Sequence, residues 1–267
     1  MKVWLNGRVL PADAAHIAPT DRGFTLGDGV FETVCVTEGR IRHLDRHLRR
    51  LRTGLTTLGL PLALDDAELV DAITRTVQAN ALGSAAVRLT VSRGPGARGA
   101  LPPSVPAPTV LVMAGSLSSS AAPASAITCT VTRRNEMSPL SRIKSVNFLD
   151  NVLARQEAAA RNADEALLLN TQGRLAEASA ANVFVLRGDT LLTPPVADGA
   201  LPGIMREILI ECCGAAEAPL SVRDVFAADS SFLSNCLGLR PLLSLDGQPL
   251  RTNRDWFAAL VRHVMMK

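Results

Sequence analysis

The sequence contains no tyrosine, and aromatic residues make up only 3% of its 267 positions. Proteins that bind single-stranded nucleic acids stack the bases on aromatic side chains, and their surfaces are usually strongly basic. Here the net charge is only +3, and the densest run of arginines, at residues 42–52, is interleaved with leucines at helical spacing. The composition therefore argues against a nucleic-acid partner.

Long hydrophobic runs are also absent. No stretch of about 18 apolar residues occurs, and the opening residues, MKVWLNGRVLP, lack the apolar core of a secretion signal. We therefore expect no membrane association and a cytoplasmic location. The five cysteines are an odd number without the paired spacing of a metal site, which favours reduced thiols and no bound metal.

Lysine is scarce. Only three of the 28 basic residues are lysines, and Lys144 is the one that lies away from both ends of the sequence. A genome that prefers arginine codons explains the scarcity, but it does not explain why this lysine remains. A lysine amine forms an imine with an aldehyde, whereas an arginine stays charged and does not. Lys144 is therefore the first candidate for a covalent role.

The pattern of hydrophobic residues predicts an α+β (α/β two-domain) fold. A small, polar and uncharged segment at residues 119–125 is the candidate linker between a smaller N-terminal domain (1–118) and a larger C-terminal domain (126–267). Hairpins are expected at Asn6-Gly7 and Glu38-Gly39. The other expected elements are helices at about 44–58, 66–81, 147–161, from 203, and 255–266, and strands at 85–93, 109–115, 126–134 and 165–170.

Two motifs have simpler explanations than a bound ligand. Residues 94–99 match the G-x-G-x-x-G pattern of dinucleotide sites, but the prolines that follow prevent the helix which such a site needs. This run is therefore predicted to be a glycine-rich loop. His43 and His47 are spaced like metal ligands on a helix, but the glutamate of a zincin motif is missing, so solvated or capping histidines are the better interpretation.

An anion site and a carboxylate remain. Gly203, Ile204 and Met205 begin a helix after Pro202, and the free backbone amides of a helix start are suited to a phosphate. Glu177 lies in apolar sequence, where a buried carboxylate needs a partner such as a protonated pyridine nitrogen. An exposed turn glutamate is an equally good reading of the local sequence.

Several stretches together resemble the class IV aminotransferase family, whose members are fold-type IV enzymes that use pyridoxal 5′-phosphate (PLP). The stretches span residues 27–241 and read GDGVFET, HLRRL, RIKSVNFLDNVLARQEA, NADEALLLNTQGRLAEASAANVFV, LPGIMRE and FLSNCLGLRPLL. The resemblance implies a D-amino acid aminotransferase-like fold, with the cofactor between a smaller N-terminal and a larger C-terminal domain. It also implies a homodimer that acts on a small-molecule amino substrate.

The resemblance also assigns roles to individual residues. Lys144 matches the Schiff-base lysine, which this assignment puts in the larger C-terminal domain. Arg50 matches the arginine that binds the cofactor phosphate, and Glu177 matches the carboxylate that keeps the pyridine nitrogen protonated. The start of the helix at Gly203, with the amides of Ile204 and Met205, matches the second phosphate contact.

Within the family, the details resemble the lyases that convert 4-amino-4-deoxychorismate into p-aminobenzoate and pyruvate for folate biosynthesis. Met205 after Ile204, and Asn235 near the C-terminal pocket strand, are typical of these lyases, and Phe31, Arg98 and Asn235 are candidate substrate contacts. The alternative is an aminotransferase of branched-chain or D-amino acids, since RIKSVNFLDNVLARQEA is very similar to D-amino acid transaminases. However, Phe31 stands where those enzymes have tyrosine, and Arg98 lacks the histidine of their Arg-x-His carboxylate site.

Overall fold

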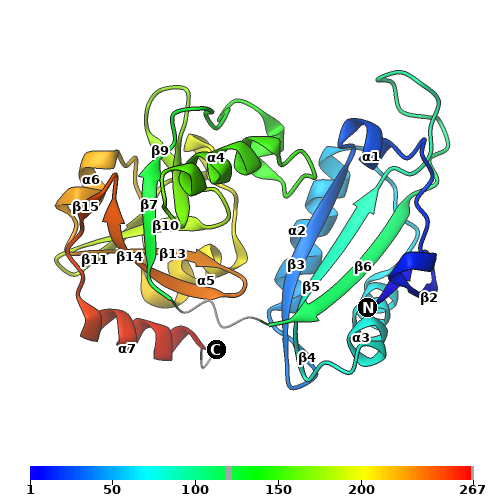
Figure 1. The fold of residues 1–267 in the computed structure, drawn as a ribbon, viewed down its shortest axis with the longest axis horizontal. Helices are drawn as coiled ribbons and strands as arrows, with labels where there is room; N and C mark the ends of the chain where they lie inside the picture. The colour runs from blue at the N-terminus through cyan, green and yellow to red at the C-terminus, as the bar shows by residue number, and fades with distance from the viewer. Residues whose placement is uncertain (118–121, 266–267) are drawn as a thin grey trace. The chain divides into compact units, whose positions relative to one another are not determined.

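The computed structural model describes residues 1–117 and 122–265 of the chain (Figure 1). The chain forms two compact units: unit 1 comprises Met1–Ser118 and Ile143–Asn147, and unit 2 comprises Ser119–Arg142 and Phe148–Lys267. Both units combine helices with a β-sheet, as expected for an α+β fold. The linker expected at 119–125 lies partly outside the described residues, and its last two residues already belong to a strand.

Unit 1 is built on a six-stranded antiparallel sheet in the order β2-β1-β6-β5-β3-β4. Its strands are β1 (Lys2–Leu5), β2 (Arg8–Pro11), β3 (Gly29–Thr37), β4 (Arg40–Ile41), β5 (Ser84–Ser92) and β6 (Thr109–Ser116). Its helices are the short η1 (Ala12–Ala14), α1 (Arg22–Leu26), α2 (Leu44–Thr57) and α3 (Asp66–Ala79).

Turn chemistry sets the two hairpins of unit 1. Asn6 and Gly7 both have positive φ angles (45° and 92°), and so do Glu38 and Gly39 (50° and 75°). Two consecutive residues with positive φ match the right-handed twist of the strands that they join. Both hairpins are confirmed at the positions that the sequence predicts.

Helices α2 and α3 cover one face of this sheet and enclose the core of unit 1 (Figure 1). Along β5 the burial alternates, with Val87 and Leu89 pointing into that core and Arg88 and Thr90 on the other face. Successive side chains of a strand point to opposite faces, so β5 presents polar groups away from the helices.

Unit 2 contains a nine-stranded mixed sheet in the order β12-β11-β10-β13-β14-β7-β8-β9, with β15 paired to β14. Its strands are β7 (Ala124–Thr128), β8 (Glu165–Leu169), β9 (Leu175–Ala178), β10 (Asn182–Arg187), β11 (Thr190–Thr193), β12 (Ala216–Glu217), β13 (Ser230–Asn235), β14 (Gly238–Leu245) and β15 (Gln248–Pro249). Its helices are η2 (Pro139–Arg142), α4 (Leu149–Ala160), η3 (Val196–Asp198), α5 (Ile204–Cys213), α6 (Val222–Ala227) and α7 (Arg254–Met265).

Two expectations from the sequence need correction. The strand expected at 126–134 ends at Thr128, because the amides of Thr130 and Val131 donate to the carboxylate of Glu157 instead of to a neighbouring strand. The segment 143–147, which carries Lys144 and was expected in the C-terminal domain, belongs to unit 1. It is held there by backbone hydrogen bonds to β3.

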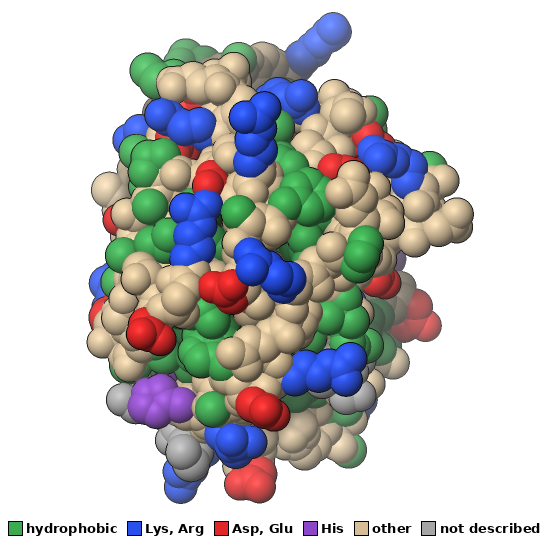
Figure 2. Space-filling model, turned by 90° about the vertical axis from the view of Figure 1, so that its left-hand side faces the viewer, with side chains coloured by type: hydrophobic (Ala, Val, Ile, Leu, Met, Phe, Trp, Pro, Cys, Tyr) green, Lys and Arg blue, Asp and Glu red, His purple; other side chains and the backbone are tan. Residues whose placement is uncertain are grey.

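In the part of the chain that the structure describes, no helix is both long and apolar enough to cross a membrane. Figure 2 shows one face of the molecule, on which acidic and basic side chains are interspersed with small apolar areas.

Candidate active site

Lys144 lies on the segment 143–147, which runs beside the start of β3. The Phe31 amide donates to the Lys144 carbonyl at 2.9 Å, and the Val146 amide donates to the Gly29 carbonyl at 3.0 Å. Lys144 is half-buried, and its Nζ lies 4.6 Å from the centroid of the Phe31 ring. Phe31, a predicted substrate contact, is therefore a direct neighbour of the predicted covalent lysine.

Arg88 also lies against Phe31, with its Cζ 3.7 Å from the ring centroid. Phe31 pairs with Thr90 across β3 and β5, and the Arg88 Nε donates to the Thr90 hydroxyl at 3.3 Å. Arg88 is half-buried, and this burial lowers the pKa of its guanidinium. A cation that is partly removed from water favours a nearby anion, so Arg88 is a candidate anion-binding residue that the sequence reasoning missed.

Arg50 lies on α2 and forms a buried cluster with Glu32 of β3. Its Nε and Nη2 donate to the two oxygens of Glu32, each at 2.7 Å. His47 Nδ1 lies 2.7 Å from Glu32 Oε2 on the same carboxylate. Burial raises the pKa of Glu32, but the hydrogen bonds and positive charge of Arg50 outweigh it, so the net pKa of this carboxyl is lowered.

The contact between His47 and Glu32 shows that the interpretation of His47 as a solvated or capping histidine is wrong. His47 is 2% exposed and bound to Glu32, so it is neither solvated nor a cap, whereas His43 stands at the start of α2 without a side-chain cap. Sequence reasoning missed Glu32 as a supporting residue. Its position among the buried residues of β3 was the available signal, since a carboxylate on a buried strand face needs a partner.

Glu177 lies on β9 of unit 2 and is buried. Its Oε1 is 3.1 Å from Arg134 Nε, and its Oε2 accepts the Leu201 amide at 2.9 Å. The exposed-turn interpretation of this glutamate is therefore wrong. The two contacts hold the carboxylate in one orientation, as a fixed charge partner requires.

The start of α5 is suited to an anion. Gly203 is its N-cap residue and supplies no side-chain cap, while the side chains of Ile204 and Met205 are buried in the core of unit 2. A Cβ at Gly203 would overlap the Asn182 amide oxygen, so only glycine fits this close approach. The backbone amides of the first turn of a helix are donors that phosphates commonly use.

The other two predicted substrate contacts have different surroundings. Arg98 is exposed on the loop between β5 and β6. Asn235 ends β13, where its amide oxygen accepts the Leu237 amide at 2.9 Å and its Nδ2 donates to the Ala180 carbonyl at 3.3 Å. Asn235 therefore shapes its own turn.

These groups fit a phosphorylated pyridine aldehyde. Unit 1 supplies an amine beside an aromatic ring and a guanidinium fixed by a carboxylate. Unit 2 supplies a buried, oriented carboxylate and an uncapped helix start at α5. Within each unit, the donor types are those that PLP uses for its aldehyde, phosphate or ring nitrogen.

The sequence matches the family model of amino-transferase class IV over residues 29–245. The chain belongs to this family, whose cofactor is PLP, and has the fold-type IV architecture of its members. This confirms both the resemblance and the fold class that the motifs indicated.

Relatives in the family carry out more than one reaction. The chain is 32% identical over 95% of its length to a Methanocaldococcus jannaschii protein (91% of which is covered) provisionally named a branched-chain-amino-acid aminotransferase. It is 31% identical over 78% of its length to the aminodeoxychorismate lyase of Bacillus subtilis, of which 72% is covered. Among solved structures, the 4-amino-4-deoxychorismate lyase of Pseudomonas aeruginosa has a TM-score of 0.84 at 31% identity, covering 97% of each chain.

Proposed function

We propose that this enzyme converts 4-amino-4-deoxychorismate into p-aminobenzoate and pyruvate, a step of folate biosynthesis. The observation that carries the proposal is the half-buried Arg88, which lies on the same Phe31 ring that Lys144 contacts. This substrate has two carboxylates and matches such a cation. A branched-chain amino acid has one carboxylate, and its side chain offers no second charge to bind.

The predicted site residues have different roles in this reaction. When bound, PLP supplies an electron sink for the carbon next to the substrate nitrogen. Lys144 would bind the cofactor aldehyde, and its amine would accept the proton from C4 of the substrate. Arg50 and the amides of Ile204 and Met205 would bind the phosphate, and Glu177 would hold the proton on the pyridine nitrogen. The electron pair left at C4 would form the third double bond of the ring as the C3–O bond breaks. The enolpyruvate that leaves would take up a proton at its methylene carbon to become pyruvate, and the ring that remains is aromatic.

An aminotransferase of branched-chain or D-amino acids is the second candidate. It is favoured by the M. jannaschii relative, and by the D-alanine aminotransferase of Bacillus licheniformis, which is 30% identical over 94% of the chain. Lys144 and Glu177 would serve the same roles in such a reaction. The difference is chemical, because a transaminase needs a second substrate with a keto group to regenerate its cofactor.

The deciding experiment is an assay of the PLP-loaded enzyme with 4-amino-4-deoxychorismate and no keto acid. Release of p-aminobenzoate and pyruvate in equal amounts is expected, and an Arg88→Gln variant should raise KM about tenfold, as expected for loss of a charge-assisted contact. If 4-amino-4-deoxychorismate releases no product, and a branched-chain or D-amino acid is turned over only when a keto acid is added, the lyase is rejected in favour of the aminotransferase.

We further propose that the enzyme is a homodimer. Large apolar side chains are exposed in both units, including Phe24 (81% exposed) in unit 1 and Met137 (79%) and Leu149 (76%) in unit 2. Neighbouring exposed apolar side chains, such as Leu149, Val152 and Leu153 on one face of α4, are typical of surfaces that a protein partner covers. A second copy of the chain, as the family resemblance implies, is the partner that we expect.

Light scattering of the PLP-loaded enzyme after size-exclusion chromatography tests this prediction. Twice the chain mass of 28.3 kDa is expected. Phe24→Asp should shift the protein toward the monomer, because a carboxylate cannot be buried cheaply in an apolar interface. Arg8→Asp, also on the surface of unit 1, is the control for adding a charge. A monomeric wild-type enzyme would contradict the proposal.

A further inference from the structure

The glycine-rich run at residues 94–99 lies in the loop between β5 and β6, residues 93–108, and the structure explains its three glycines. Gly94 has a φ of +81°, and a Cβ there would overlap the Ala107 carbonyl oxygen at the other end of the loop. Gly99 has a φ of +132°. A Cβ at Gly96 would lie 2.9 Å from the Cδ of Arg22. The motif therefore shapes a loop that closes around the Arg22 side chain.

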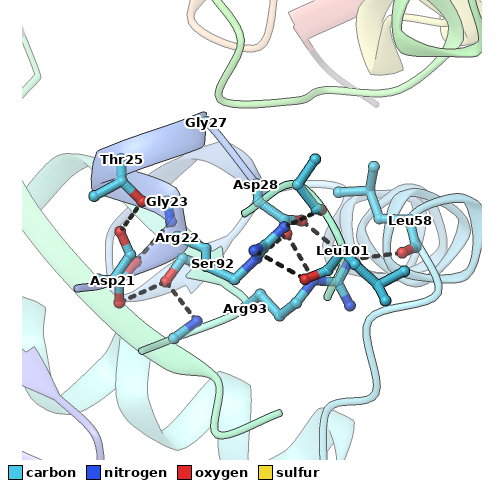
Figure 3. Close-up of polar contacts among 12 residues, drawn as sticks. Asp21, Arg22, Gly23, Thr25, Gly27, Asp28, Leu58, Ser92, Arg93 and Leu101 are labelled. Carbon is cyan, nitrogen blue, oxygen red and sulfur yellow. Dashed lines mark hydrogen bonds and ion pairs between the residues drawn. The ribbon is translucent and has the colours of Figure 1, made fainter. Parts of the chain in front are cut away.

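Asp21 binds both strand ends at the base of this loop, and Figure 3 shows its contact with Ser92. Its carboxylate is 1% exposed and accepts the hydroxyls of Ser92 and Thr109, at 2.9 and 2.7 Å. Ser92 ends β5 and Thr109 begins β6. The base of the loop is thus held by a buried carboxylate.

Arg22 binds a part of the loop that lies farther from the base. Its guanidinium is almost fully buried and donates to the carbonyls of three consecutive loop residues: Gly99 (2.9 Å), Ala100 (2.8 Å) and Leu101 (3.3 Å). The side chains at residues 97–102 of this loop are nevertheless exposed, with Leu101 at 87%. An exposed loop whose backbone is bound by a buried cation is fixed in place while its side chains remain available.

Asp28 completes the arrangement by binding two arginines, as Figure 3 shows. It accepts Arg22 Nε at 2.8 Å, and it accepts Arg93 Nε and Nη2 at 2.7 and 3.0 Å. Arg93 in turn donates to the carbonyls of Leu58 and Gly59, at the end of α2. One carboxylate therefore anchors two equally buried arginines, of which Arg22 reaches the loop and Arg93 reaches the helix.

We propose that Arg22 is a positioning residue for substrate binding, because it holds the loop that presents Arg98. This inference rests on the proposed function, and it takes Arg98, a substrate contact implied by the family resemblance, as a second group that binds a substrate carboxylate beside Arg88. Arg98 is one residue before the first carbonyl that Arg22 binds. An arginine on a free loop loses conformational entropy when it captures a ligand, whereas one on an anchored loop loses less. Removing the anchor therefore weakens substrate binding more than it slows the chemical step.

The first test compares Arg22→Gln with the matched variant Arg93→Gln, using the PLP-loaded enzyme and trypsin. Cleavage of the Arg98–Gly99 bond requires the loop to leave its anchored conformation. We expect cleavage to be about tenfold faster in Arg22→Gln, since the cleavage rate follows the equilibrium population of the open loop when reclosing is fast. The rate in Arg93→Gln should remain at the wild-type value. Equal rates in wild type and Arg22→Gln would overturn the proposal.

The second test uses steady-state kinetics at saturating PLP. Arg22→Gln and Arg98→Ala should each raise KM about tenfold while kcat changes much less, which is the mark of lost binding. The double variant should be no worse than Arg98→Ala, because Arg22 acts through Arg98. A normal KM in Arg98→Ala would reject Arg98 as a substrate contact. A raised KM in Arg98→Ala with a normal KM in Arg22→Gln would reject only the positioning role of Arg22.

A third variant keeps the proposal testable if Arg22→Gln does not fold. Gly96→Ala retains every charge but places a methyl group 2.9 Å from the Arg22 Cδ, which must then move. The same increases in trypsin cleavage and in KM are expected. Wild-type values of both in a folded Gly96→Ala protein would contradict the role of Arg22.

Discussion

At the residue scale, three charged side chains, those of Arg50, Glu177 and Arg22, are each held in place by an oppositely charged side chain. Arg50 is oriented by Glu32, Glu177 by Arg134 and the Leu201 amide, and Arg22 of α1 by Asp28. Arginine and carboxylate groups form directional paired hydrogen bonds, so each pair fixes the angle as well as the position of its partner.

Replacing Lys144 tests the central chemical assignment. Lys144→Ala should lose the covalent link to PLP while retaining the fold, because the backbone of this segment, through the Lys144 carbonyl and the Val146 amide, makes its hydrogen bonds to β3. Borohydride reduction followed by mass spectrometry of peptides checks this, with Lys2→Ala as the control. A reduced cofactor adduct on another lysine would refute the assignment.

Replacing Glu32 tests the support of Arg50. Glu32→Gln keeps the size of the side chain but removes the charge that binds Arg50 and His47, so Arg50 is held less firmly. We expect PLP affinity to fall about tenfold, the effect of losing one charge-assisted pair. Titration of PLP into apoprotein measures it. Asp45→Asn, an exposed charge on the same helix α2, should leave the affinity unchanged; a weakening as large as that of Glu32→Gln would mean that only net charge matters.

At the element scale, helices α2 and α3 are fixed by different kinds of contact at their ends. Helix α3 begins with a capping box formed by Asp65 and Glu68, a signal that is entirely local. Helix α2 begins at His43 without a side-chain cap, and carbonyls at its end are bound by Arg93, which is 34 residues from Gly59 in the sequence. The helix that carries Arg50 is therefore anchored from the β5–β6 loop.

The capping box of α3 gives an element-scale prediction. Asp65→Ala removes the side chain that accepts the Glu68 amide at 2.8 Å. The free energy of unfolding should fall by about 1 kcal/mol, the usual effect of losing an N-cap. Denaturant unfolding measures this loss, and Asp71→Ala, an exposed residue in the interior of the same helix, is the control. Equal losses in both variants would show that the cap contributes nothing.

At the scale of the whole molecule, buried or hydrogen-bonded carboxylates make the free energy of unfolding depend on pH. Burial raises the pKa of Asp28, but its hydrogen bonds to Arg93 and Arg22 outweigh this and lower it. Burial also raises the pKa of Glu157, but the hydroxyl and amide of Thr130 outweigh this and lower it from 4.5 to about 2. A carboxyl whose pKa is lower in the folded protein stabilises the fold above its unfolded pKa.

This contribution is lost as the pH falls through the folded pKa. For Glu157 the loss spans the range from pH 4.5 to about 2, while its contribution is constant at neutral pH. Melting temperatures measured across this range should therefore decline toward acid. The decline should be shallower in Glu157→Gln, which has no proton to gain at this position. An identical acid dependence in that variant would refute the contribution of Glu157.

Local sequence determined much of this protein. The turns at Asn6-Gly7 and Glu38-Gly39 and the helices α2 and α3 follow from residues that are neighbours in the chain, and the structure has each of them where the sequence predicts it. The family motifs added the cofactor and the fold class, which the family match confirms.

Only the tertiary structure decided which distant side chains meet. Glu32 binds residues 15 and 18 positions away, and Arg22 binds carbonyls 77 to 79 positions away. It also decided that strand β7 ends at Thr128 and that the segment 143–147 joins unit 1. The physical reason is that turn and helix preferences arise within a few residues, whereas a buried charge gains its partner only after strands and helices pack together.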